Sequence, residues 1–291
     1  DLNGNGVIDT SNDANGDNQI QPNEMLPFGQ DECVMFTVYP GGSCARALGV
    51  DADNHVWVGM WSQMKLRRLT PETGDQTHEV AIPGNPYGLV LDGEGVVWVS
   101  GRGGNKLIRV DPNVDPPEVT SWTPPCGSLY GITVDMLGKV WIGHYSDHCI
   151  TRFDPLTNQF STITQNLGGH CPRGMAGSTD GFMYSGLGCS GSQQIAKVDI
   201  NTLQVSLVDI SPGTTPIGVA LDANGYVWAV NNSTSNATKV DPHTGEKFGP
   251  YPVGQGPYTY SDMTGYALQN FTAPQGSYTT TLGGWSEIRV K

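Results

Sequence analysis

The residues with the clearest chemistry stand in an acidic, glycine-rich stretch near the start of the chain. Between residues 13 and 24, side chains with oxygen atoms recur at alternate positions, and a glutamate ends the stretch. A loop that wraps around Ca²⁺ has this twelve-residue spacing: side chains at positions 1, 3 and 5, a backbone carbonyl at 7 and a bidentate Glu at 12. The predicted ligands are Asp13, Asn15, Asp17, Gln19 and Glu24.

The preceding residues repeat this pattern less completely. Position 12 of the earlier loop is Asn12, which lacks the bidentate carboxylate. This earlier loop resembles dockerin or thrombospondin type 3 calcium loops more than a full EF-hand. A solvated acidic linker is the alternative, because runs of Asp, Asn and Gly are also common in linkers. We assign residues 1–33 as a calcium-loop segment with Ca²⁺ as its cofactor. The ligands predicted in the earlier loop are Asp1, Asn3, Asn5 and Asp9.

From residue 34 onward a unit of about 42 residues repeats. Residues 86–113 are the clearest copy, with three short runs of β-branched and aromatic residues separated by Gly, Asp and Pro. Such runs predict antiparallel strands joined by tight turns. Two positions mark the copies, the second of them in five of the six. The small residue of the first strand is Ala47, Gly88, Gly131, Gly174, Gly218 or Thr259, and the aromatic residue of the second strand is Trp57, Trp98, Trp141, Tyr184 or Trp228.

Each unit has three clear strands and a weaker fourth, which is typical of a propeller blade. We therefore predict an all-β fold, a six-bladed β-propeller of four-stranded blades over residues 34–291. The sixth unit supplies three strands, and Met35–Tyr39 is the candidate for its fourth, so that strands from the two termini pair. The alternatives are seven blades or an incomplete last blade. The blades are predicted to begin near residues 45, 86, 129, 172, 216 and 257.

Composition limits the partners and the location. The net charge of −13 argues against nucleic acid, because phosphate binding needs clustered Lys and Arg. No apolar run approaches the roughly 20 residues of a membrane span. Six cysteines without a C-x-x-C motif favour disulfides and an oxidising compartment. We expect an extracellular or cell-surface protein, with the periplasm as an alternative. The expected disulfides are Cys126–Cys149, Cys171–Cys189 and Cys33–Cys44.

One end of the channel is predicted to carry the ligand. In a propeller, the connections between blades and the loops between the second and third strands lie at the same end. Aromatic and Arg residues gather there and would suit a sugar, a peptide or an anionic small molecule. The alternative is that these side chains only fill the channel mouth. The predicted ligand-binding residues are Arg46, Trp61, Tyr87, Arg102, Tyr130, His144, Tyr145, Arg173 and Tyr258.

Histidines at the same end suggest a second metal. His144 and His148 flank Asp147, and His170 lies on the next connection between blades. Three imidazoles and a carboxylate are a ligand set for zinc or another transition metal. The alternative is that these histidines are loop residues that form hydrogen bonds.

The blade pattern resembles the virginiamycin B lyase-like propellers, which are related to NHL and gluconolactonase-type propellers. Pro86–Trp98, Leu129–Trp141 and Pro216–Trp228 carry this resemblance. It implies the fold, whereas the reaction depends on other residues. The streptogramin lyases of this group use magnesium held by glutamates and a histidine base in their later blades. Between residues 211 and 260 this chain has only His243 and Glu246 of those types, in a turn away from the channel mouth.

These observations favour a binding or assembly module over an enzyme. The expected partner is a protein or glycan at the cell surface, with self-assembly and membership of a larger extracellular protein or polymer as further expectations. A metal-dependent lyase or lactonase acting at the propeller axis is the alternative. Its candidate residues are Asn231, Asn232, His144 and His170.

Overall fold

The computed structural model describes residues 1, 3–17, 20–27, 29–34, 37–189, 191–259, 278–282 and 285–289. These residues form five four-stranded antiparallel sheets and one two-stranded sheet. Their single helical turn is the 3₁₀ helix η1 (Arg102–Gly104). None of their helices is long and apolar enough to span a membrane. The all-β prediction is therefore confirmed.

Each four-stranded sheet consists of four consecutive strands and forms one blade. The first two blades comprise β1 (Ala45–Val50), β2 (Val56–Met60), β3 (Lys65–Leu69), β4 (Gln76–Ala81), β5 (Pro86–Leu91), β6 (Val97–Gly101), β7 (Lys106–Asp111) and β8 (Glu118–Trp122). The next two comprise β9 (Leu129–Val134), β10 (Val140–His144), β11 (Cys149–Asp154), β12 (Gln159–Ile163), β13 (Pro172–Gly177), β14 (Phe182–Leu187), β15 (Gln194–Asp199) and β16 (Val205–Asp209). The fifth comprises β17 (Pro216–Leu221), β18 (Val227–Asn231), β19 (Asn236–Val240) and β20 (Lys247–Pro252).

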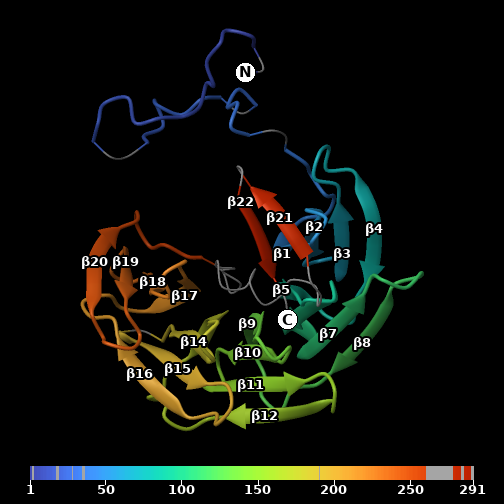
Figure 1. Cartoon of the computed structure of the whole chain (residues 1–291), viewed down its shortest axis with the longest axis vertical. Helices are drawn as coiled ribbons and strands as arrows, with labels where there is room; N and C mark the ends of the chain where they lie inside the picture. Colours follow the sequence, from blue (N-terminus) through green and yellow to red (C-terminus); the bar gives the residue numbers. More distant parts are fainter. Residues whose placement is uncertain are drawn as a thin grey trace.

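The five blades follow one another in an arc around a central axis, with the first strand of each blade innermost (Figure 1). These inner strands approach closely: a Cβ atom on Gly174 in β13 would lie 2.9 Å from the Cα atom of Gly218 in β17. The apolar core consists of four layers, each between two consecutive blades. A single blade buries its faces only against its neighbours, as the repeat predicts.

The turn between the first and second strands holds each blade together. In the second blade, the Asp92 carboxylate accepts the backbone N–H groups of Glu94 and Val96, both at 3.0 Å. Its other oxygen accepts the indole N–H of Trp98 at 2.7 Å. The same Asp–Trp hydrogen bond recurs in the first, third and fifth blades. One carboxylate thus fixes both the turn and the buried aromatic residue.

The prediction of six four-stranded blades is wrong for the described residues, which form five. Residues 37–39 of the expected closing strand form no strand, and Met35 and Phe36 lie outside the described residues. Instead, β21 (Tyr278–Leu282) and β22 (Trp285–Arg289) pair with each other. Most of the predicted sixth unit, residues 260–277, also lies outside the described residues. That unit has Leu268 near the place of the repeated Trp, so its sequence lacks the anchor on which the repeat depends.

Candidate functional site

A shift in strand register places one side chain of each blade at the mouth of the channel. The shift lies near the start of each innermost strand, for example between Pro86 and Gly88 in β5 and between Pro172 and Met175 in β13. An extra residue in one strand changes the direction of its side chain. The residues located in these shifts include Arg46, Tyr87, Tyr130 and Arg173.

These side chains meet residues from the loops between the second and third strands, and together they form a continuous Arg–Tyr cluster. Arg46 lies over the Tyr87 ring, with 4.0 Å from the guanidinium carbon to the ring centroid. Arg102 lies 4.9 Å from the same ring and 5.5 Å from the Tyr130 ring. Such cation–π contacts order the guanidinium groups. The cluster consists of Arg46, Trp61, Tyr87, Arg102, Tyr130, Tyr145 and Arg173.

Arg173 completes the cluster on the side of the fourth blade. Its guanidinium carbon lies 4.4 Å from the centroid of the Tyr145 ring and 5.5 Å from that of Tyr130. Tyr258 extends the cluster, since its hydroxyl lies 3.1 Å from that of Tyr87. The structure therefore brings together every predicted ligand-binding residue except His144.

The cluster concentrates positive charge in an acidic protein. Within the described part of the chain, Arg102 and Arg173 form no ion pair with a carboxylate. Burial, together with the charge of Arg102, lowers the pKa of Arg173. Burial and the hydrogen bond to Tyr87 raise the pKa of Tyr258. A negative group between these side chains would compensate the charge and receive their hydrogen bonds.

His144 is a structural residue of β10. It is fully buried, and its Nδ1 lies 2.8 Å from the carbonyl oxygen of Gly127. Because a carbonyl can only accept, Nδ1 carries the proton, and Nε2 accepts the hydroxyl of Thr151 at 2.8 Å. Burial lowers the pKa of His144 to about 4, so the ring is neutral near pH 7. With both nitrogens in use, His144 does not join the predicted zinc set or act as a base.

Two of the three predicted disulfides form, Cys126–Cys149 and Cys171–Cys189. The prediction of Cys33–Cys44 is wrong, because both residues are exposed, free cysteines. That pairing depended on the closing strand between them, residues 35–39, and the described residues 37–39 form no strand.

The two N-terminal loops have parallel hydrogen-bond patterns. In the second loop, the Glu24 carboxylate accepts the backbone N–H of Asn15 at 3.1 Å. In the first loop, the Glu32 carboxylate accepts that of Asn3 at 3.0 Å and that of Asp9 at 2.9 Å. Glu32 thus occupies the place of the glutamate that position 12 lacks. The sequence pattern missed it because it reads only a fixed spacing. Gln19 lies outside the described residues.

The other predicted calcium ligands point into these loops. Asp1 accepts the backbone N–H groups of Asn5 and Gly6 at 2.9 and 2.7 Å, and Asp13 accepts that of Gly16 at 2.7 Å. The side-chain amides of Asn3 and Asn5 both donate to one oxygen of Asp9 at 2.8 Å. Each loop therefore gathers carboxylate and amide oxygens around its own turn.

No family model and no curated protein matches the chain. Solved structures do. A streptogramin B lyase is 18% identical with a TM-score of 0.64, covering 72% of this chain and 68% of the lyase. Virginiamycin B lyase from Staphylococcus aureus is 17% identical with a TM-score of 0.65, covering 85% and 84%. A propeller in the nidogen/laminin complex is 14% identical with a TM-score of 0.58, covering 76% and 84%.

The fold is that of a virginiamycin B lyase-like β-propeller. At these identities the likeness shows the fold alone, so the chemistry depends on the residues of this chain. The side-chain amide nitrogens of two candidates for an axial lyase site form structural hydrogen bonds. Asn231 is buried and donates to Thr238 at 2.9 Å, and Asn232 donates to the carbonyl of Pro257 at 3.0 Å. His144 is buried as described above.

His243 lies at the opposite end of this virginiamycin B lyase-like propeller. Its Nε2 is 2.7 Å from an oxygen of Asp180, and its Nδ1 is 3.3 Å from the amine of Lys197. It lines a cavity of about 400 Å³ whose walls are turns of the fourth and fifth blades, among them Asp222 and Tyr226. This position agrees with the sequence prediction that His243 is remote from the channel mouth.

Proposed function

We propose that this propeller is a secreted or cell-surface binding module whose Arg–Tyr cluster holds an acidic group of a protein partner. The main support for this proposal is the Arg–Tyr cluster, in which three guanidinium groups converge between aromatic rings at one end of the axis. An Arg fork binds a carboxylate or sulfate through paired hydrogen bonds. Two disulfides at the same end are typical of extracellular proteins. The propeller in the nidogen/laminin complex is a precedent for protein binding by this fold.

The buried polar atoms of the cluster support this choice of ligand. Within the described residues, the Arg173 Nε and the Tyr130 hydroxyl are buried without a hydrogen-bond partner. A buried donor without a partner costs about 1–3 kcal/mol, which a bound acceptor would recover. Tyr87 and Tyr130 are themselves buried, so their rings hold the guanidinium groups that lie over them in place.

Titration with an acidic peptide tests this function. Tryptophan fluorescence, to which Trp61 at the edge of the cluster contributes, reports binding of poly-glutamate, with a sulfated oligosaccharide as the second probe. We expect Arg102→Ala to weaken peptide binding by about tenfold or more, because charged hydrogen bonds are lost. Arg109→Ala is the matched control, since Arg109 is already paired with Asp111 at 2.8 Å. Equal losses in both variants, or no binding of the peptide, would contradict the proposal, and binding of the oligosaccharide alone would indicate a glycan ligand.

We further propose that residues 1–33 bind Ca²⁺ at two loops, with Glu24 and Glu32 as the closing carboxylates. The parallel contacts of these glutamates with Asn15 and Asn3 support this assignment. Affinities of the order of 10⁻⁴–10⁻³ M are expected if the loops behave as those of other extracellular modules do. Calcium would then order the segment.

Calorimetry with Ca²⁺ measures the number of sites. The Glu32→Gln variant should lose one of the two calcium sites. Glu118 is an exposed glutamate on β8, so the Glu118→Gln variant should keep both sites. An unchanged stoichiometry in Glu32→Gln would show that Glu32 is no ligand. No heat of binding in the unmodified chain would remove the calcium assignment altogether.

A further inference from the structure

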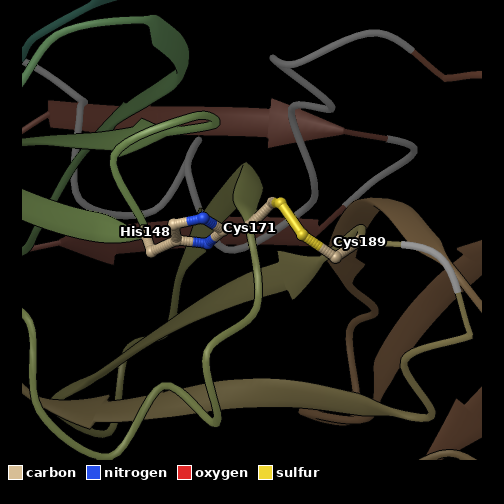
Figure 2. A group of neighbouring side chains, drawn as sticks. All are labelled: His148, Cys171 and Cys189. Carbon is tan, nitrogen blue, oxygen red and sulfur yellow. A yellow bond between two sulfur atoms is a disulfide. The ribbon is translucent and has the colours of Figure 1, made fainter.

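A second group of metal-binding side chains lies beside the Arg–Tyr cluster. His148, Cys171 and Cys189 come together from three segments, and Figure 2 shows the imidazole next to the two sulfur atoms. One ligand atom from each residue lies within 4.8 Å of the other two. Cys171 precedes β13, Cys189 follows β14, and the two form a disulfide. The sequence predicted histidines and a carboxylate at this end, whereas the structure assembles one histidine and two sulfurs.

The backbone and a hydrogen bond both orient His148. Its φ angle of 51° places it in the left-handed region, where Met64, Asn105 and Ser235 occur in the corresponding turns of other blades. Its Nδ1 lies 3.2 Å from the carbonyl oxygen of His170, so Nδ1 carries the proton. The lone pair of Nε2 is then available. A histidine that binds a metal usually donates its other N–H to a carbonyl or carboxylate in this way.

We propose that reduction of Cys171–Cys189 creates a Zn²⁺ site with His148. Two molecules of a thiol reductant deliver two electrons and two protons to the sulfurs and leave as their own disulfide. Zn²⁺ then displaces the two thiol protons and binds two thiolates and the Nε2 of His148. Tetrahedral zinc with Zn–S bonds of about 2.3 Å holds its sulfurs roughly 3.8 Å apart. The S–S bond itself excludes this geometry, so metal binding depends on the redox state.

The three ligands leave the fourth zinc position open to water. Three protein ligands and one exchangeable position are characteristic of reactive zinc sites, whereas structural sites use four. Because His148 is exposed, the metal can enter from solvent, while Cys171 is only 5% exposed and anchors the site in the protein. This proposal is independent of the anionic ligand of the Arg–Tyr cluster.

Two other places in the described chain show why this group is distinctive. Asp51, Asp53 and His55 also lie within metal-binding distance of one another. There the Arg68 guanidinium pairs with both carboxylates, at 2.7 and 3.3 Å, and so occupies the place of a cation. The second disulfide, Cys126–Cys149, has no third metal-binding group beside it among the described residues. Both places serve as internal controls.

Cobalt titration tests the proposal, because Co²⁺ replaces Zn²⁺ in such sites and its thiolate complexes absorb light. The full chain is reduced with a water-soluble phosphine, desalted without oxygen and checked for its β-sheet circular dichroism. We expect one equivalent of Co²⁺ with thiolate absorption, displaced by Zn²⁺, and no such absorption for the oxidised chain. His148→Asn retains a residue suited to the left-handed region and should weaken binding by more than the roughly tenfold cost of losing an outer-shell partner.

The controls separate this site from the other thiols. His55→Asn should bind Co²⁺ as the unmodified chain does. The double variant Cys171→Ser with Cys189→Ser should lose the thiolate absorption, whereas Cys126→Ser with Cys149→Ser should keep it. Unfolding on reduction, absence of thiolate absorption, or unchanged affinity in His148→Asn would each overturn the proposal. The His148 variant decides the matter even where a cysteine variant does not fold.

Discussion

The two ends of the propeller use polar residues in opposite ways. At the end formed by the turns between the first and second strands, each Asp carboxylate bonds to its own turn and to the Trp of its own blade. At the other end, the residues of the Arg–Tyr cluster come from different blades, and some of their polar atoms have no partner within the described residues. At the first end, the Asp–Trp hydrogen bonds of four blades each lie within a single repeat, whereas the cluster at the second end is assembled only when the blades stack.

This difference separates scaffold from function. A buried polar group that lacks a partner costs free energy, so its presence needs an explanation. The repeated Asp–Trp pairs need none, because they stabilise four of the five described blades in the same way. The residues that vary between blades at the cluster end are the ones whose hydrogen bonds a ligand would complete. Function is therefore to be sought where the repeat is not self-sufficient.

The largest effect is expected from removing one repeated aromatic residue. Trp98 is buried between the second and third blades, with its ring centroid 6.0 Å from that of Trp122 and 5.9 Å from that of Phe153. Trp98→Ala should lower the free energy of unfolding by about 3–5 kcal/mol, because it opens a cavity and leaves Asp92 without its indole donor. Chemical denaturation measures this loss, and Trp98→Phe should lose less. A loss below about 1 kcal/mol in Trp98→Ala would show that the repeated end does not hold the blades together.

The sequence predicts the repeated end far better than the cluster end. The spacing of Asp92 and Trp98 recurs in other blades, so turn, strand and core position follow from one local pattern. The residues of the Arg–Tyr cluster can be predicted to lie near one another because the strand order of a propeller places them at one end. Which of them touch depends on distances between blades, and His144 lies apart from the cluster because it is buried against Gly127 and Thr151.

The wrong blade count and two contacts that the sequence did not predict have the same origin. The six-blade prediction extended the repeat into residues 257–291, where the sequence no longer carries the Asp–Trp anchor. Glu32 and the neighbourhood of His148 were missed because their partners are distant in sequence and no fixed spacing links them. Local periodicity therefore predicts the contacts within one blade, but it does not predict the contacts between residues from different blades.

A smaller effect should come from pH acting on His144, the polar residue of the cluster end whose hydrogen bonds are complete. Its folded pKa of about 4 lies below the usual 6.5, so the unfolded chain binds the proton more tightly. The contribution of the neutral, buried His144 to the free energy of unfolding is fully present above pH 6.5 and is lost as the pH falls toward 4. At 1.36 kcal/mol per pKa unit, the loss amounts to about 3 kcal/mol.

Denaturation midpoints between pH 4 and pH 8 test this slope. His144→Gln keeps a hydrogen-bonding side chain that does not titrate, so its stability should fall less steeply toward acid than that of the unmodified chain. His78→Gln provides the comparison for a histidine on the outer strand β4. If the His144 and His78 variants show the same pH dependence, then His144 is not held neutral by burial.

The smallest effect concerns the fourth blade, where the repeated end departs from its own rule. Ser178 and Tyr184 replace the Asp and Trp of the other blades, and the buried Tyr184 hydroxyl has no partner within the described residues. Burial also raises the pKa of this hydroxyl, so it stays neutral. Tyr184→Phe should therefore leave the free energy of unfolding unchanged or raise it by up to about 1 kcal/mol, because a desolvated polar group is removed.

Tyr87→Phe is the matched change at the cluster end, where the hydroxyl lies 3.1 Å from that of Tyr258. Losing that hydrogen bond should lower the free energy of unfolding by about 0.5–1.5 kcal/mol. Each variant removes one tyrosine hydroxyl. If the two changes in the free energy of unfolding have opposite signs, the contrast reports whether that hydroxyl has a hydrogen-bond partner. A clear loss of stability in Tyr184→Phe would mean that a buried water satisfies this hydroxyl. The aromatic residue of the fourth blade would then be satisfied, as the Trp residues of the other four described blades are.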